Sequence, residues 1–366
     1  MILSGADVVT PGGVQPGATL IIEGDRIAEI PGLSRRSGAA AKADAAGAID
    51  LRGHIVVPGF IDVHVHGLDG LDTLDGGDVV AAIAERLPTF GVTAFCPTTV
   101  ACGPDALREV LQTVASLRST RAGLPTVAAN AATVGARVLP AHLESNFINP
   151  EYRGAQPATC LRLPPSPSES AHYDHGFDGR DILSEIDAAG ESVGIVTLAP
   201  ELDGALDLIR HLVSHGRRVS LGHSGATLEQ ARAGIAAGAR HATHLFNRMT
   251  PLAHRAPGLA GAVLSREDIA AELICDGYHV HPAMCGVAIG AKGTRGIMAI
   301  TDGTAGSGLP VGTGARLGGR AISVRAEAAF LDDGTLAGST LTMDRAFRTI
   351  VTSFGASIVD AATMCS

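Results

Sequence analysis

From residue 55 onward, short apolar runs alternate with segments in which apolar residues recur at helical spacing, and this alternation most constrains the fold. Segments such as 78–87 and 228–237 carry the helical pattern. The runs predicted to be strands are 55–64, 92–97, 136–143, 193–199, 218–222, 241–246, 270–275 and 296–301. Eight strands alternating with helices over roughly 250 residues are what a (β/α)8 barrel requires, so the sequence predicts an α/β fold with a TIM-like barrel.

An open, doubly wound sheet is the alternative arrangement of the same elements. Nucleotide-binding sheets of that kind carry G-x-G-x-x-G after an early strand, or a G-x-x-x-x-G-K-[ST] loop. The sequence has neither motif in those positions. It therefore favours the barrel.

The first 57 residues precede the alternating pattern and have the character of short strands joined by turns. Residues 10–13 and 23–26 are turn sequences, and residues 18–22 form an apolar strand between them. We therefore expect a small β-sandwich-type module over residues 1–57 and the barrel over residues 58–366.

His64 and His66 are two residues apart at the end of the first predicted barrel strand. Alternate residues of an extended strand point to the same side, so the two imidazoles would face one point. Such a pair suits a metal site. By itself, however, it is equally compatible with two unrelated core or surface histidines.

Residues with metal-binding or acid–base side chains also follow other predicted strands, namely Glu144, His223, His244, Asp276 and Asp302. The C-terminal ends of barrel strands meet at one face, where barrel enzymes carry their chemistry. Imidazole and carboxylate ligands suit Zn²⁺, with Fe²⁺ as an alternative. We therefore expect a divalent metal centre there with one or two ions per chain.

Composition limits the classes of partner. The net charge is −9 and the sequence pI is about 5.8, which argues against nucleic acid. The N-terminus lacks the layout of a signal peptide, and no apolar stretch of about 18 residues predicts a membrane span. The six cysteines form no C-x-x-C pair, which suits reduced thiols in a cytoplasmic protein.

Several longer stretches resemble one known family. They are residues 58–67, 91–99, 198–201, 222–227, 243–251, 255–258, 276–279 and 336–343. On these stretches the chain resembles the amidohydrolase superfamily, and within it the N-acetylglucosamine-6-phosphate deacetylase family. The resemblance runs from about residue 1 to the end of the chain.

The resemblance implies an activity and a set of roles. The acetamide of N-acetylglucosamine 6-phosphate would be hydrolysed to glucosamine 6-phosphate and acetate, as a step of amino-sugar catabolism. Glu144, His223 and His244 would hold the main metal, and His64 and His66 a second metal where a member has one. Metal-bound hydroxide would attack the acetamide, and Asp302 would act first as general base and then as general acid. A helix-capping role is the structural alternative for Asp302.

The small number of lysines limits which group could bridge two metal ions in this chain. Many two-metal barrel hydrolases bridge their ions with a carbamylated lysine, and this chain has only Lys42 and Lys292, neither at a predicted strand end. A bridging acid would therefore be a native carboxylate, for which Glu144 is the candidate. The lack of a suitably placed lysine excludes the urease-like and hydantoinase-like branches of the superfamily.

The resemblance also implies contacts with a small-molecule amino-sugar phosphate. Asn247, Arg255 and His279 would bind the substrate, and Arg255 would reach the site of a neighbouring subunit, which implies a homodimer. Arg248 stands beside the expected phosphate position. It would contact the phosphate or lie solvated on the surface.

Some residues depart from the family pattern. Ser145 and Asn146 replace a Gly-Pro pair, and Gln156 replaces a pocket-lining histidine. An amide donates a hydrogen bond but carries no charge, so a different N-acyl amino sugar or another N-acyl amine is the alternative substrate. A non-catalytic scaffold is disfavoured, since no proposed ligand and no base is missing.

Two further expectations concern the chain end and one loop. Residues 361–366 have a helical pattern, whereas the family continues beyond that helix into strands that complete the N-terminal module. We therefore expect a less complete sandwich over residues 1–57. Residues 161–180, which include His172 and His175, are expected to form a surface loop with solvated histidines.

Overall fold

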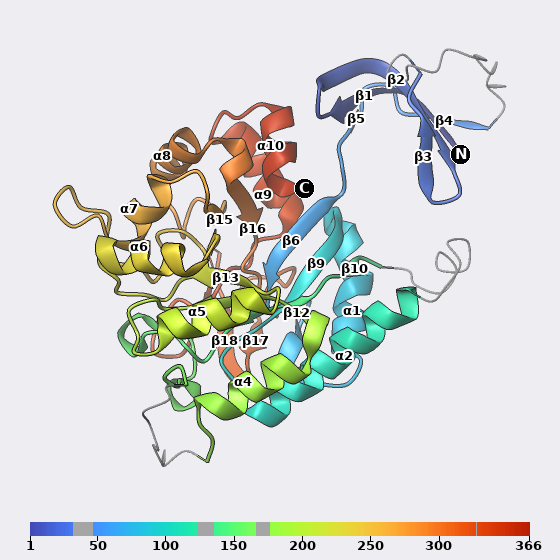
Figure 1. Cartoon of the computed structure of the whole chain (residues 1–366). Coiled ribbons are helices and arrows are strands. Elements are labelled where there is room, and N and C mark those ends of the chain that lie inside the picture. The colour runs from blue at the N-terminus through green and yellow to red at the C-terminus, as the bar shows by residue number, and fades with distance from the viewer. Residues whose placement is uncertain (32–46, 123–134, 166–175, 327) are drawn as a thin grey trace.

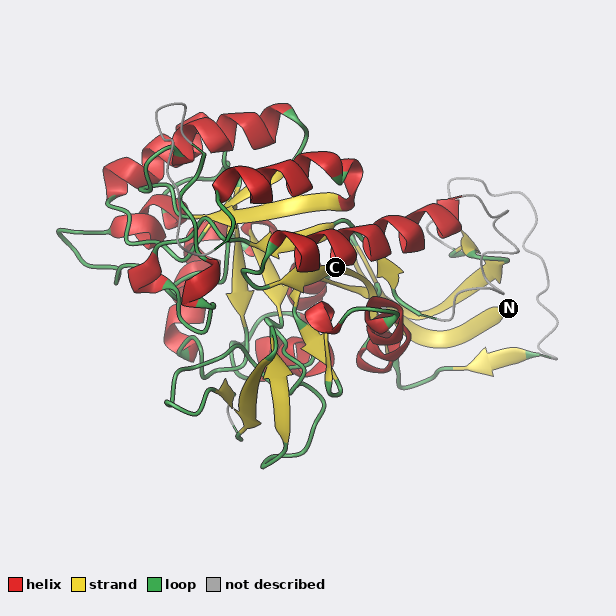
Figure 2. Ribbon diagram, turned by 90° about the horizontal axis from the view of Figure 1, so that it is seen from below, coloured by secondary structure: helices red, strands yellow, loops and turns green. Residues whose placement is uncertain are grey.

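The computed structural model describes residues 1–31, 47–122, 135–165, 176–326 and 328–366. A parallel barrel forms the centre, helices cover its outside, and a separate N-terminal sheet lies to one side (Figures 1 and 2). The (β/α)8 TIM-like barrel predicted from the alternating pattern is confirmed.

Each barrel strand pairs in parallel with the next. In order they are β6 (Phe60–Val65), β9 (Val92–Thr99), β11 (Ala141–Glu144), β12 (Val193–Leu198), β13 (Arg218–Leu221), β14 (His241–Ala242), β15 (Ala270–Ile274) and β16 (Ile297–Ile300). The residues after β16 close the ring onto β6, because the backbone N of Asp302 donates to O of His64 at 3.0 Å. The backbone N of His66 likewise donates to O of Gly303 at 2.8 Å.

Amphipathic helices cover the barrel. They are α1 (Val79–Arg86), α2 (Pro104–Ala122), α4 (Gly179–Ala188), α5 (Ala205–Ser214), α6 (Leu228–Ala237), α7 (Gly258–Leu264), α8 (Pro282–Lys292), α9 (Met343–Thr352) and α10 (Ile358–Cys365). In α5, Leu208, Ile209 and Leu212 recur at helical spacing and are buried against the barrel. The predicted helices at 78–87, 228–237 and 361–366 are confirmed with small shifts of their ends.

Three predicted strands differ from the observed ones. Residues 55–64 form two strands, because Ile55–Val56 (β5) joins the N-terminal sheet and Pro58 has no N–H with which to continue a ladder. Residues 136–143 are likewise divided at Pro140 into β10 (Arg137–Val138) and β11. The strand predicted over residues 241–246 stops at Ala242, and His244 and Phe246 then adopt positive φ values of 28° and 75°.

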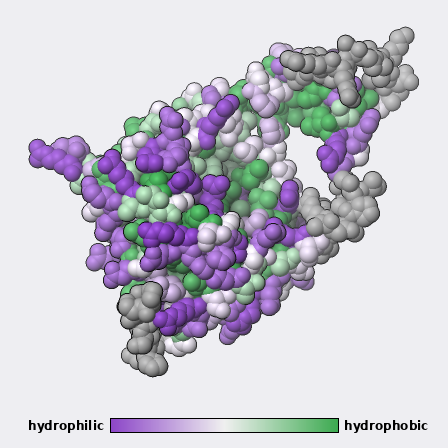
Figure 3. All heavy atoms as spheres, in the orientation of Figure 1, coloured by the Kyte–Doolittle hydropathy of each residue, from purple (hydrophilic) through white to green (hydrophobic). Residues whose placement is uncertain are grey.

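The N-terminal module is a single sheet in the described part of the chain. Its strands are β1 (Ile2–Thr10), β2 (Gly13–Glu23), β3 (Arg26–Glu29), β4 (Ala48–Asp50) and β5. Ala6, Val8 and Leu20 form a small core on one face. Figure 3 shows apolar surface over this module. Its exposed large apolar side chains include Val14, Ile27, Ile49 and Ile55. The turns predicted at 10–13 and 23–26 are confirmed.

A three-stranded antiparallel sheet follows the last barrel strand and was not predicted. It consists of β17 (Gly314–Leu317), β18 (Arg320–Val324) and β19 (Ala329–Phe330). Its buried Leu317 and Ile322 pack with Val100, which directly follows β9. The sheet therefore covers part of the C-terminal end of the barrel.

The remaining elements are short. The two-residue strands β7 (Gly67–Leu68) and β8 (Leu71–Asp72) pair with each other. The 3-10 helices are Thr73–Asp75, Leu87–Phe90, Pro150–Tyr152, Ala158–Cys160, Gly190–Ser192 and Thr294–Gly296. Within the residues that the structure describes, no helix combines the length and apolar character needed to cross a membrane.

Candidate active site

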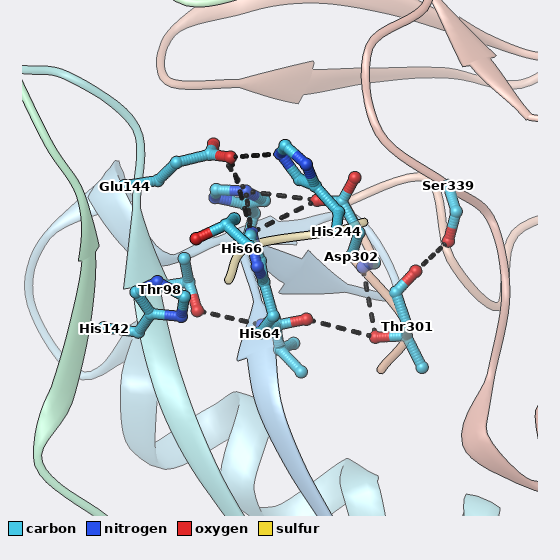
Figure 4. A network of polar contacts seen from close by, with 12 residues as sticks. His64, His66, Thr98, His142, Glu144, His244, Thr301, Asp302 and Ser339 are labelled. Atoms are coloured by element: carbon cyan, nitrogen blue, oxygen red, sulfur yellow. Dashed lines mark hydrogen bonds and ion pairs between the residues drawn. The ribbon is translucent and has the colours of Figure 1, made fainter. Parts of the chain in front are cut away.

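The residues predicted at the strand ends meet at the C-terminal end of the barrel. The side chains of His66, Glu144, His244 and Asp302 converge on one space, with His64 directly beside them (Figure 4). All of these residues are buried, as is His223. Each of these residues lies on a barrel strand or just after its end, and the strands are β6, β11, β13, β14 and β16. The closed barrel therefore brings together residues that are far apart in the chain.

Glu144, His223 and His244 form the first cluster. Oε1 of Glu144 lies 2.7 Å from Nε2 of His223 and 2.8 Å from Nε2 of His244. The two Nε2 atoms are 3.1 Å apart. One ion could contact all three side chains.

His64 and His66 form a second cluster that also uses Glu144. Their Nε2 atoms are 3.2 Å apart. Nε2 of His66 lies 3.4 Å from Oε2 of Glu144, and Nε2 of His64 lies 3.8 Å from Oε1. The Glu144 carboxylate therefore lies between the two imidazole pairs. Its Oε1 faces the first cluster and also His64, and its Oε2 faces His66.

Asp302 faces the second cluster. Its Oδ1 lies 3.4 Å from Nε2 of His64 and 3.3 Å from Nε2 of His66. Its backbone is held on both sides, since its N donates to His64 and its O accepts from N of Ser339 at 2.8 Å. The carboxylate thus has a fixed position at the mouth of the barrel.

The geometry of the two clusters fits a divalent metal. Imidazole nitrogens bound to a tetrahedral zinc ion at about 2.0–2.1 Å lie roughly 3.3 Å from each other. The observed separations of 3.1 and 3.2 Å between paired Nε2 atoms are close to that value. Pairs of imidazole nitrogens that point at each other beside carboxylates are arranged to share a cation.

Several of these side chains depend on an uncommon backbone conformation. His223, His244 and Asp302 have positive φ values of 47°, 28° and 49°. Non-glycine residues rarely adopt this region, and such strain of order 1–3 kcal/mol per residue concentrates at functional sites. In each case the strained residue comes two positions after its strand ends.

Hydrogen bonds fix the tautomers of two of the four histidines. Nδ1 of His223 donates to the carbonyl O of Tyr152 at 2.8 Å, which leaves Nε2 for the site. Nδ1 of His64 donates in the same way to Oε2 of Glu272 at 2.8 Å. Nδ1 of His66 and of His244 has no hydrogen-bond partner among the described residues.

The electrostatics of the cluster favour positive charge. Burial alone lowers the pKa of His64, but the charges of Glu272, Asp302 and Glu144 outweigh it and raise that pKa to about 9. Burial opposes a raised pKa for His66 too, yet its contacts with Asp302 and Glu144 bring it to about 10. The carboxylates thus draw protons onto buried imidazoles, and a metal ion would supply the same charge.

The two acids of the site stay ionised despite burial. Burial raises the pKa of Glu144, but the charge and hydrogen bond of His223 and the contact with His244 hold it well below its ordinary value. Burial also raises the pKa of Asp302, and the contact with His66 and the charge of His64 bring it below its ordinary value. Both groups are therefore carboxylates at neutral pH.

A small pocket of about 50 Å³ opens above these residues. Four of the five residues predicted to bind substrate line it, namely Gln156, Asn247, Arg248 and His279. Arg248 is exposed at the mouth and has a positive φ of 50°. Leu317 from the unpredicted sheet lines the same pocket.

His279 enters the pocket with one nitrogen free. Its Nδ1 contacts Oδ2 of Asp276 at 2.5 Å, and its Nε2 is buried without a hydrogen-bond partner in the described chain. Asp276 also accepts from the backbone N of His279 at 2.8 Å. The carboxylate therefore orients the imidazole toward the pocket.

Arg255 is not part of this pocket in its own chain. It is exposed in the loop between β14 and α7, which extends away from the barrel (Figure 1). Lys292 lies in α8 and donates from Nζ to the carbonyl O of Val263, remote from the pocket. Lys42, His172 and His175 fall outside the described residues.

Two features of the site were missed in the sequence. Gln156 does more than line the pocket, since its Nε2 donates to Oε2 of Glu144 and its Oε1 accepts from N of Ala101 at 2.7 Å. Glu272 touches His64 and was assigned no role. One signal for Glu272 was available, because it is a charged residue inside the apolar run of the strand at 270–275.

Comparison with known proteins places the chain in a family, although no family model matches it. It is 36% identical to N-acetylglucosamine-6-phosphate deacetylase of Bacillus subtilis, over 80% of this chain and 69% of that protein. It is 38% identical to the Rattus norvegicus enzyme of the same name, over 85% of this chain and 73% of that protein. The chain belongs to the N-acetylglucosamine-6-phosphate deacetylase family.

Solved structures and a further relative extend this similarity. The Mycobacterium smegmatis N-acetylglucosamine-6-phosphate deacetylase, solved as a mutant in complex with N-acetylglucosamine 6-phosphate, is 32% identical, with a TM-score of 0.82 over 100% of this chain and 88% of that one. The Thermotoga maritima deacetylase is 30% identical, with a TM-score of 0.79 over the same shares. An N-acetylgalactosamine-6-phosphate deacetylase from Escherichia coli O157:H7 is 36% identical, over 85% of this chain and 76% of that protein. The resemblance stated from sequence motifs is thus confirmed at the level of the family.

Proposed function

We propose that this chain hydrolyses the acetamide of N-acetylglucosamine 6-phosphate to glucosamine 6-phosphate and acetate, with a divalent metal as cofactor. The observation that carries the proposal is the buried cluster in which Glu144 lies between two histidine pairs with Asp302 facing it. Membership of the deacetylase family supports the choice of substrate.

The proposed ion is Zn²⁺, and Fe²⁺ is the alternative. Imidazole and carboxylate ligands suit both ions. His223, His244 and Glu144 would hold the main ion, and His64 and His66 would hold a second where two are present, with Glu144 shared. The chemistry that such an ion supplies is Lewis acidity, which makes water a nucleophile near neutral pH and polarises a carbonyl.

Asp302 performs the proton transfers. As a carboxylate it accepts a proton at Oδ1 from the attacking water, and the same oxygen then donates that proton to the departing nitrogen. An amide anion leaves poorly, so protonation of the nitrogen is required for the C–N bond to break. The held backbone of Asp302 keeps Oδ1 in reach of both steps.

The substrate end of the pocket is built for a polar, anionic sugar. His279 presents its unpaired Nε2, Asn247 offers an amide, and Arg248 brings positive charge to the mouth. An arginine can bind phosphate through two donors at once. Arg255 would add a second arginine from the neighbouring subunit of a homodimer, which accounts for its exposure in its own chain.

The direct test is an assay of amine and acetate release by the zinc-loaded protein. N-acetylglucosamine 6-phosphate should be turned over, and unphosphorylated N-acetylglucosamine should be a much poorer substrate because the arginines have no phosphate to bind. An N-acetyl amino acid serves as the control for unspecific amidase activity. Absence of turnover of the phosphorylated sugar would contradict the proposal.

The second candidate function is hydrolysis of a different N-acyl amino sugar or of another N-acyl amine. It is favoured by Gln156, which replaces a histidine and bonds to Glu144, and by the similarity to a deacetylase named for N-acetylgalactosamine 6-phosphate. Comparing kcat/KM for the two phosphorylated sugars decides between them.

A cytoplasmic location is part of the proposal. Five of the six cysteines are buried, and all six are free thiols. Burial raises the pKa of the Cys102 thiol to about 12, so it stays protonated and unreactive. Free buried thiols are typical of proteins from a reducing compartment.

A further inference from the structure

Glu272 is a fully buried carboxylate inside the barrel, on the strand β15, and the proposed mechanism does not use it. An isolated buried carboxylate is costly, so such a group is retained only with strong partners. Its partners in this structure include a residue from each cluster of the candidate metal centre.

The contacts of Glu272 reach both clusters of the centre. Oε2 accepts from Nδ1 of His64 at 2.8 Å and from the backbone N of His244 at 3.1 Å. Oε1 lies 2.9 Å from Nε2 of His241. One carboxylate thus holds a side chain of the second cluster and the backbone of the first.

A separate metal site at Glu272 would be a different explanation, since His64, His142 and Glu272 lie close together. His142 rules this out. Its Nδ1 donates to the carbonyl O of Val63 at 2.9 Å, and its Nε2 is bonded to Oγ1 of Thr197 at 2.8 Å. Both ring nitrogens are therefore occupied by hydrogen bonds, and neither has a lone pair free for an ion.

We infer that Glu272 is a positioning residue, which fixes His64 with Nδ1–H toward the carboxylate and Nε2 toward the candidate metal centre. The inference rests on the proposed function, because a metal gives that orientation its use. A carboxylate on the far nitrogen of a ligating imidazole sets its tautomer and raises its basicity. Glu272 does for His64 what the carbonyl of Tyr152 does for His223.

Two of the neighbouring imidazoles lack a hydrogen-bond partner on Nδ1 among the described residues, so the orientation of the site depends more strongly on Glu272. Nδ1 of His66 and of His244 has no hydrogen-bond partner in the described chain. Glu272 supports one of them indirectly, through the backbone N of His244. Loss of its two acceptor bonds would loosen a ligand in each cluster.

The test compares the zinc affinity of three variants by competition with a chelator. Glu272→Leu removes both acceptor bonds and should weaken zinc binding by about 10–100-fold. Glu272→Gln keeps the shape and one acceptor oxygen, so it should lose less affinity than Glu272→Leu. Ser220→Ala removes a buried hydroxyl, bonded to Oγ1 of Thr243, without touching a proposed ligand or His142, and its zinc affinity should match that of the wild type.

Wild-type affinity in a folded Glu272→Leu variant would overturn the inference. If that variant does not fold, NMR of the zinc-loaded wild type with ¹⁵N-labelled histidine gives an independent answer. His64 should carry its proton on Nδ1 and bind zinc through Nε2, and the reverse assignment would overturn the inference. A wild-type protein that binds no zinc would contradict the proposed function and this inference together, whereas the preceding outcomes contradict this inference alone.

Discussion

Oγ1 of Thr301 donates a 2.6 Å hydrogen bond to Oδ2 of Asp62. The other carboxylate oxygen accepts from the backbone N of His64 at 3.2 Å and from that of Thr301 at 3.3 Å. Asp62 is on β6 and Thr301 directly follows β16, so this bond joins the two strands between which the barrel closes. The closure places His64 opposite Asp302.

The stability of the protein should depend on the ionisation of Asp62. Burial raises the pKa of Asp62 from 3.8 to about 7, against hydrogen bonds from Thr301 and His64 that lower it. A raised carboxyl pKa contributes stability that is complete below pH 3.8 and lost as the pH rises through 7. Relative to Asp62→Asn, the free energy of unfolding of the wild type should therefore fall by up to roughly 4 kcal/mol between these pH values. Urea denaturation of both proteins across this range measures the difference, and a constant difference would show that Asp62 has an ordinary pKa.

Asp302→Asn should abolish most of the activity. The amide cannot accept the proton of the attacking water, so kcat should fall by roughly 10²–10⁴-fold. Zinc content should remain at the wild-type level, because Glu144, His223 and His244 are unchanged. Activity assays and metal analysis on the same preparation check both parts, and a variant with near wild-type kcat would refute the assigned role.

Metal content should depend most on Glu144. Because this carboxylate belongs to both histidine clusters, Glu144→Ala should remove every bound ion. Replacing His64 and His66 together by Asn should leave one ion, held by the first cluster. Metal analysis per chain after dialysis measures both, and a Glu144→Ala protein that keeps a stoichiometric ion would contradict the shared role.

Gln156→Leu should impair the site without any change in a proposed ligand. It removes the donor to Glu144 and leaves the N–H of Ala101 unpaired, which should cost about 1–3 kcal/mol of stability. Zinc affinity should fall by about 10–100-fold, as for other partners of metal ligands. Gln156→His is the matched control because it keeps a hydrogen-bond donor. Equal zinc affinity in the two variants would argue against this role.

Subunit mixing tests whether Arg255 acts across a dimer. Arg255→Ala and Asp302→Asn should each be weakly active alone. In a mixed dimer, the subunit with Arg255→Ala keeps its own Asp302 and receives Arg255 from its neighbour. Unfolding and refolding an equal mixture should therefore restore roughly a quarter of the wild-type activity, since half the dimers are mixed and each has one complete site. No gain over the separate variants would place Arg255 outside the neighbouring site.

The sequence by itself determined the barrel and the proposed ligands. Period-two and helical patterns are local properties, and strand ends converge in any parallel barrel, so His223, His244 and Asp302 could be assigned to one face. Where proline or positive φ interrupts a strand, the local pattern failed, as in residues 136–143 and 241–246.

Only the tertiary structure decided which side chains support the proposed ligands. The bond from His64 to Glu272 joins residues 208 positions apart, and no periodicity signals a pair at that distance. The same holds for the bond from Gln156 to Glu144, because the direction of a loop side chain depends on the packing of distant elements. The sequence therefore determined which chemical groups reach the site, and the closure of the barrel decided how they are oriented.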